Sequence, residues 1–103
     1  MQEFIESRRD QIAELCRRHH VSRLAIFGSA LRDDFDPAHS DVDLLVEFEP
    51  LPSTVYAPNF FSLTDELQYL FNRRVDLLVP TAIRNPYLKQ TVERDREKLY
   101  VAA

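Results

Sequence analysis

The sequence predicts a small α/β domain in which a mixed β-sheet is flanked by helices. Short apolar runs alternate along the chain with longer segments whose apolar residues recur at helical spacing. Their order is helix, strand, strand, helix, strand, helix, which favours a small sheet covered by helices. Because the 103 residues contain no repeat and no linker-like tract, we expect a single domain over residues 1–103.

Helices are predicted over residues 3–18, 59–71 and 87–96. In the first helix the apolar positions follow helical spacing, which places the only cysteine, Cys16, in the core. The second helix follows residues 49–58, where three prolines predict a loop.

Three apolar runs predict strands. The first covers residues 24–27 and ends at Gly28, and the second covers residues 42–48. The third covers residues 74–80 and ends at a proline, which cannot donate to a sheet. Residues 99–102 are either a short closing strand or a tail.

Composition and charge limit the function classes. Hydrophobic residues make up 45% of the chain, which indicates a globular fold, and no apolar run approaches the roughly 18 residues needed to span a membrane. The formal net charge of −4 argues against direct nucleic-acid binding, although metal ions could still bridge an acidic chain to nucleotides. With one cysteine and no apolar leader, we expect a cytoplasmic protein.

Two carboxylates stand at the head of the second predicted strand, in the stretch SDVDLLVEF. Asp41 and Asp43 are two residues apart, so they lie on one face of an extended strand, where their like charges repel. A divalent cation removes that repulsion, and Mg²⁺ favours carboxylates together with substrate phosphates. Asp76 has a similar setting in the third strand, and three carboxylates suit in-line displacement at phosphorus. The alternative is that Asp41 and Asp43 merely face water at a strand end.

Gly28 is the only glycine in the chain and follows an apolar strand. A glycine at this point allows a tight turn or a close approach of the backbone to a ligand. If a helix begins at Ser29, its free N–H groups form an anion site, to which the serine hydroxyl adds a hydrogen bond. The alternative is a plain turn in which Ser29 caps a helix.

The segments FGSALR (27–32) and SDVDLLV (40–46), followed by RVDLLV (74–79), resemble the signature of the DNA polymerase β-like nucleotidyltransferase superfamily. The chain is similar to its minimal nucleotidyltransferases of bacteria and archaea over nearly its whole length. This resemblance implies the minimal nucleotidyltransferase fold. It also implies a partner, because members are typically encoded beside a HEPN-domain toxin as a toxin–antitoxin pair.

The resemblance assigns the nucleotide-binding residues. Gly28 and Ser29 would hold the β- and γ-phosphates of a nucleoside triphosphate, Arg32 would neutralise phosphate charge, and Ser40 would belong to the same site. In this sequence Arg32 is followed by Asp33 where family members often have glycine, and the spacer before Ser40 is slightly long. These departures concern the loop and Arg32 rather than the carboxylates.

The resemblance also assigns the catalytic and metal-binding residues. Asp41 and Asp43 would bind two Mg²⁺ ions, and Asp76 would complete the site of the ion that activates the attacking hydroxyl and would help to remove its proton.

The implied reaction is transfer of AMP from ATP, as substrate, to a tyrosine hydroxyl of a HEPN-family toxin, with release of pyrophosphate. Such a protein is an antitoxin that acts by covalent modification and forms a hetero-oligomer with its toxin. Two alternatives are a non-catalytic antitoxin that inhibits a HEPN partner by binding alone, and transfer to a small molecule or RNA. The acidity of the chain and the lack of a second domain disfavour the last of these.

Overall fold

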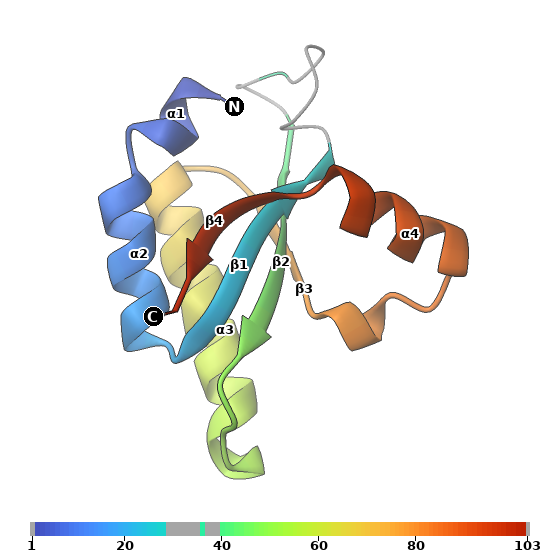
Figure 1. Cartoon of the computed structure of the whole chain (residues 1–103). Helices are drawn as coiled ribbons and strands as arrows, with labels where there is room; N and C mark the ends of the chain where they lie inside the picture. The colour runs from blue at the N-terminus through green and yellow to red at the C-terminus, as the bar shows by residue number, and fades with distance from the viewer. Residues whose placement is uncertain (1, 29–35, 37–39, 103) are drawn as a thin grey trace.

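A computed structural model of the chain describes residues 2–28, 36 and 40–102 (Figure 1). Its centre is a four-stranded sheet in the order β3-β2-β1-β4. The strands are β1 (Val21–Phe27), β2 (Val42–Phe48), β3 (Val75–Leu78) and β4 (Glu97–Val101). Strands β2 and β3 are parallel, whereas β1 is antiparallel to both β2 and β4. The predicted fold class, a mixed sheet with flanking helices, is confirmed.

Helices cover both faces of the sheet. Three of them, α1 (Glu3–Glu6), α2 (Arg9–Arg18) and α3 (Ser53–Phe71), lie on one face, and α4 (Pro86–Asp95) lies on the other (Figure 1). A single turn of 3₁₀-helix, η2 (Pro80–Ala82), links β3 to α4. In the part of the chain that the structure describes, no helix is long and apolar enough to cross a bilayer.

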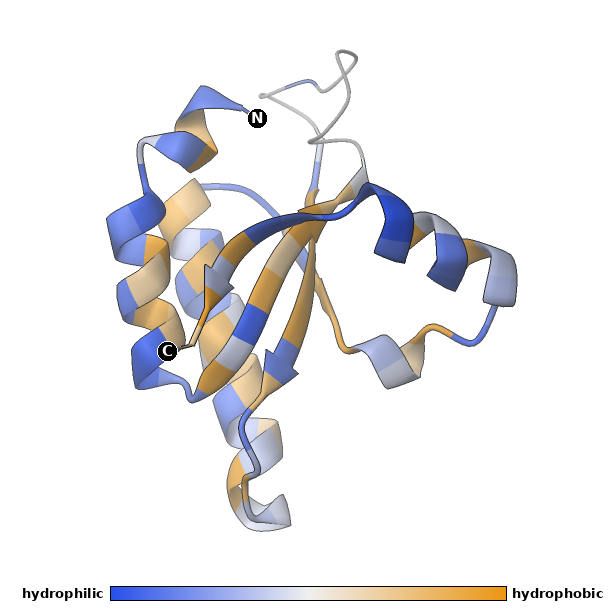
Figure 2. Ribbon diagram, in the orientation of Figure 1, coloured by the Kyte–Doolittle hydropathy of each residue, from blue (hydrophilic) through white to orange (hydrophobic). Residues whose placement is uncertain are grey.

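The main core lies between the sheet and the helices α1 to α3, where apolar side chains of the strands meet those of the helices (Figure 2). Its fully buried side chains include Ile5, Ile12, Cys16, Leu24, Ile26, Val42, Leu44, Val46, Leu63 and Leu67. A second, smaller cluster on the opposite face consists of Phe27, Leu45, Ile83 and Val92. The prediction that Cys16 is a core residue is confirmed. The sheet therefore has one thickly covered face and one thinly covered face.

The predicted single helix over residues 3–18 is wrong, because the chain forms α1 and α2 with a break between them. The break centres on Arg8, whose backbone N–H bonds the carbonyl of Ile5 rather than that of Phe4. The Phe4 carbonyl instead accepts from the Arg8 guanidinium at 2.8 Å, and Arg8 Nε reaches the Leu70 carbonyl of α3 at 3.2 Å. A side chain thus replaces a backbone group and redirects the helix.

The predicted loop over residues 49–58 is also wrong in its second half, because α3 begins at Ser53 and contains Pro58. Aromatic packing supports this start: the ring centroid of Phe48 lies 5.4 Å from that of Tyr56 and 6.3 Å from that of Phe60. Such contacts stabilise an element against the loss of one backbone hydrogen bond at a proline.

The remaining boundaries agree with the sequence to within a few residues. Strand β2 has the predicted bounds, β1 begins three residues earlier than expected, and β3 is shorter than its apolar run. The undecided segment at the C-terminal end is a strand, because β4 pairs with β1. The polar segment between β1 and β2 lies mostly outside the described residues.

Candidate nucleotide site

The sheet register brings two of the predicted carboxylates together. Asp43 of β2 and Asp76 of β3 are direct partners in the parallel pair, so their Cα atoms are about 4.8 Å apart and their side chains share a face. The neighbours Val42 and Leu44 point into the main core, which places both carboxylates on the thinly covered face. Asp43 is partly buried and Asp76 is exposed.

Gly28 lies against the Asp43 carboxylate. Its neighbour Phe27 is the β1 partner of Asp43, and the backbone of Gly28 turns there with a φ of +74°. A Cβ atom added at Gly28 would lie 3.2 Å from Asp43 Cγ and would overlap Asp43 Oδ2. The position therefore requires a glycine for two reasons, the left-handed backbone and the close approach to the carboxylate.

Asp41 and Ser40 precede β2 at the same end of the sheet. Asp41 is partly buried, and the next residue, Val42, donates its N–H to the Arg74 carbonyl before β3 at 3.0 Å. Ser40 is tied to Asp36: its N–H donates to the Asp36 carbonyl at 2.8 Å, and its hydroxyl accepts from the Asp36 N–H at 3.0 Å. The Ser40 hydroxyl is thus bonded to Asp36 in this structure, and its predicted role toward nucleotide stays a prediction.

The other two predicted nucleotide-binding residues, Ser29 and Arg32, lie outside the described residues. Their roles also stay predictions.

The donor set at this end of the sheet is suited to a hard divalent cation. Carboxylate oxygens are preferred ligands of Mg²⁺, which often uses one or two carboxylates together with waters and substrate phosphates. Within residues 2–28, 36 and 40–102, no three Asp, Glu, His or Cys side chains are gathered into a group able to hold a metal ion. Three like charges repel one another, so their approach needs a compensating positive charge. Asp43 and Asp76 are the pair that the fold sets side by side.

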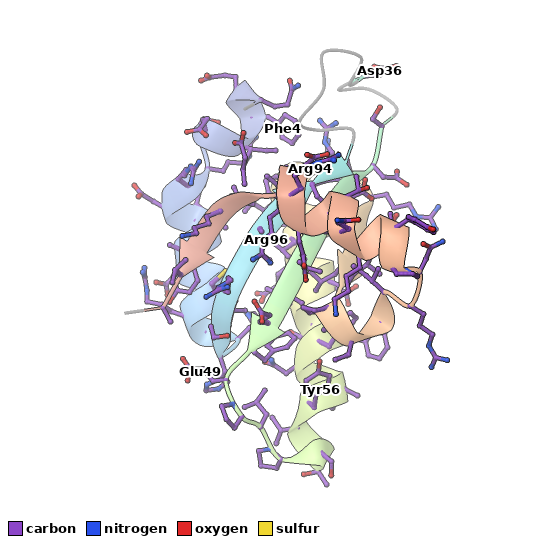
Figure 3. The ribbon with its side chains drawn as sticks, turned by 45° about the vertical axis from the view of Figure 1, so that its right-hand side comes forward. Phe4, Asp36, Glu49, Tyr56, Arg94 and Arg96 are labelled. Atoms are coloured by element: carbon purple, nitrogen blue, oxygen red, sulfur yellow. The ribbon has the colours of Figure 1, made fainter. Side chains whose placement is uncertain are left out.

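One cation beside this site carries no local sequence signal. Arg96 joins α4 to β4, and the next residue, Glu97, pairs with Ile26 of β1. The guanidinium therefore belongs to a segment that runs alongside β1 and passes in front of it in Figure 3. Only the β1–β4 pairing reveals this, because the sequence separates Arg96 from Gly28 by most of the chain.

Similarities to known proteins agree with this geometry. The sequence profile of the nucleotidyltransferase domain matches residues 8–99. A protein of Methanocaldococcus jannaschii assigned as a protein adenylyltransferase is 41% identical over 81 residues, 79% of this chain and 79% of the relative. The protein adenylyltransferase MntA of Thermococcus cleftensis is 35% identical over 88 residues, 85% of this chain and 82% of MntA.

Solved structures share the fold. The structure of a minimal nucleotidyltransferase superimposes with a TM-score of 0.69 at 31% identity, covering 92% of each chain. A toxin–antitoxin structure with AMP-PNP superimposes with a TM-score of 0.63 at 20% identity, covering 91% of this chain and 73% of the other. The chain is thus a nucleotidyltransferase, and it belongs to the nucleotidyltransferase domain family, among the minimal members that include protein adenylyltransferases.

Proposed function

We propose that the chain transfers AMP from ATP to a tyrosine hydroxyl of a HEPN-family toxin in a Mg²⁺-dependent reaction, and that it thereby neutralises the toxin. The relatives named protein adenylyltransferase support a protein acceptor. One structure that shares the fold contains a tri-AMPylated HEPN toxin of Shewanella oneidensis in complex with its MNT antitoxin. That complex supports a HEPN partner, held in a hetero-oligomer.

The single observation that carries the proposal is the meeting of Gly28, Asp43 and Asp76 at one end of the sheet. The turn at Gly28 brings the backbone close to the Asp43 carboxylate, where a side chain would not fit, and the same backbone would be open to a phosphate. The carboxylates of Asp41, Asp43 and Asp76 would hold two Mg²⁺ ions beside it. When bound, such ions would stabilise the negative charge of the phosphates during the transfer.

The transfer itself forms one bond and breaks one. The tyrosine oxygen attacks the α-phosphorus of ATP, and the bond from that phosphorus to the bridging oxygen of the β-phosphate breaks. Pyrophosphate leaves with the electron pair of the broken bond. The Asp76 carboxylate, which is exposed, would help to accept the proton of the tyrosine hydroxyl.

Intact-protein mass spectrometry tests the proposal directly. A HEPN toxin encoded beside this chain is incubated with the chain, ATP and Mg²⁺, and a gain of one or more AMP units is expected. The gain disappears in the double variant Asp41→Asn with Asp43→Asn. Asp10→Asn with Asp65→Asn makes the same change of charge on the outer helices, away from the site, and it retains the gain.

The same experiment separates catalysis from binding alone. Toxin that is inhibited in a stable complex without added mass would refute transfer and would identify a non-catalytic antitoxin. Inhibition that survives the Asp41 and Asp43 changes would show that binding alone is sufficient to inhibit the toxin.

A further inference from the structure

Arg96 comes directly before β4, on the side of β1 opposite to the carboxylates of β2 and β3. Asp76 pairs with Asp43, and Asp43 pairs with Phe27. On the other side of β1, Glu97 pairs with Ile26, so Arg96, which precedes Glu97, and Phe27, which follows Ile26, lie at the same end of the β1–β4 ladder. Because Phe27 comes immediately before Gly28, the turn at Gly28 has the carboxylates on its β2 side and Arg96 on its β4 side. Figure 3 shows the segment that carries Arg96 passing in front of β1.

Arg96 is also an unusual cation in this chain. In the part of the chain that the structure describes, it is the one basic residue that is partly buried and whose side chain has no hydrogen bond or ion pair. Arg8 and Arg73, which are buried to a similar degree, reach backbone carbonyls. The Lys and Arg residues that share the lack of such contacts are all exposed: Arg74, Arg84, Lys89 and Lys98. A partly buried arginine whose charge has no partner gives up part of its hydration without compensation, unless a ligand supplies an anion.

A triphosphate is the anion that fits this position. The proposed site includes three aspartates, and a nucleoside triphosphate would add further negative charge beside them. A guanidinium donates two parallel hydrogen bonds to phosphate oxygens and stays charged at every relevant pH. We propose that Arg96 binds the β- or γ-phosphate of the nucleotide from the β4 side of Gly28, an inference that rests on the proposed function.

Two neighbouring arginines fit this role less well. Arg94 lies on the same segment, but its guanidinium is held by Asp95, with Nε 3.0 Å and one terminal nitrogen 3.4 Å from the two carboxylate oxygens. Arg74 lies at the same end of the sheet, but it precedes β3 and is separated from Gly28 by β2. Of these three arginines, Arg96 is therefore the one that lies on the β4 side of Gly28 and whose side chain has no partner among the described residues.

Nucleotide affinity tests this role without any acceptor protein. The dissociation constants of ATP and AMP, both with Mg²⁺, are measured by calorimetric titration of the full chain and of Arg96→Gln, Arg96→Lys and Arg94→Gln. Arg96→Gln should weaken ATP about tenfold or more, as loss of a charge-assisted hydrogen bond does, and AMP by less than about twofold. Arg96→Lys should recover part of the loss, and Arg94→Gln should leave both constants nearly unchanged.

Each outcome decides the inference. Equal affinities in Arg96→Gln and the unaltered chain overturn it, and so does an equal loss for ATP and AMP, which would indicate a general structural effect. A larger loss in Arg94→Gln than in Arg96→Gln would move the role to Arg94 and overturn it too. If the chain binds ATP but modifies no toxin, the proposed function fails while the comparison of variants still decides Arg96. If the chain binds no ATP, both fail.

Discussion

Replacing Gly28 by alanine tests the geometry of the site most directly. The backbone at Gly28 has a φ of +74°, which costs an L-residue about 1–2 kcal/mol. The new Cβ would also lie 3.2 Å from Asp43 Cγ and would overlap Asp43 Oδ2, so the carboxylate must move. The two effects act on the same turn but have different causes, and they are therefore separable.

The expected loss of stability is large for a chain of this size. For a domain of about 60–100 residues, 1 kcal/mol lowers the Tm by roughly 4–8 °C. The backbone cost alone thus lowers the Tm of Gly28→Ala by at least about 4 °C, and the displaced carboxylate adds to it. Thermal unfolding followed by far-ultraviolet circular dichroism measures the shift.

A double-mutant cycle with Asp43→Ala separates the two causes. Alanine at position 43 removes Cγ and Oδ2 and leaves only its Cβ, at an ordinary contact distance of 3.4 Å from the new methyl group. Gly28→Ala should then cost only the backbone term, which gives a coupling free energy of at least about 0.5 kcal/mol between the two positions. Equal costs of Gly28→Ala with and without the Asp43 carboxylate would refute the close approach. No cost in either background would refute the backbone argument as well.

Three further predictions concern stability and reactivity. Burial raises the pKa of the Cys16 thiol to about 12, so iodoacetamide at pH 8.5 should alkylate the unfolded chain but not the folded one. Because the folded pKa lies above the unfolded value of 9.0, the contribution of the Cys16 thiol to the free energy of unfolding should be fully present below pH 9. Above pH 9 the free energy of unfolding should fall by about 1.4 kcal/mol per pH unit until pH 12, as measured by urea unfolding at each pH. Glu66→Ala removes the carboxylate that lies 2.8 Å from the buried His19 Nε2, and it should lower the free energy of unfolding in urea by about 1–2 kcal/mol. The control Glu14→Ala breaks exposed ion pairs and should cost less than about 0.5 kcal/mol. Equal costs would contradict a stabilising contact between Glu66 and His19. Pro58→Ala restores a donor inside α3 and should stabilise the chain by about 1–2 kcal/mol in the same assay, and a loss of stability would show that the proline is required for the helix start.

Periodicity predicted those parts of the fold in which local and tertiary preferences agree. The apolar run of β2 has its predicted bounds, because this central strand is covered on both faces. The end of α3 is also as predicted, since Asn72 adopts the left-handed conformation that commonly ends a helix. Where one side chain overrides a local preference, periodicity failed. The break at Arg8 depends on the Leu70 carbonyl, which comes from a distant part of the chain.

The candidate site also has residues that the sequence predicted and residues that it could not predict. The spacing of Asp41 and Asp43, with Gly28 before them, was visible because a strand fixes the face on which each side chain lies. The partnership of Asp43 with Asp76 required a guess that β2 and β3 are neighbours, and no pattern within either strand gives their register. Arg96 was not predictable at all, because its position depends on β4 pairing with β1, and the sequence left that segment undecided between strand and tail.

The position of Asp43 explains how this chain tolerates an acid on its central strand. The strand residues Val42 and Leu44 bury their side chains in the main core, and that burial fixes the register of β2 whatever lies on the other face. The opposite face is thinly covered at this end, so Asp43 is only partly buried and has Gly28 rather than a bulky side chain beside it. The apolar residues of the strand thus hold the carboxylate in place, and the absence of a side chain at Gly28 leaves room for it. A substitution that fills this space should therefore damage the site before it damages the fold, whereas a substitution of Leu44 should damage the fold itself.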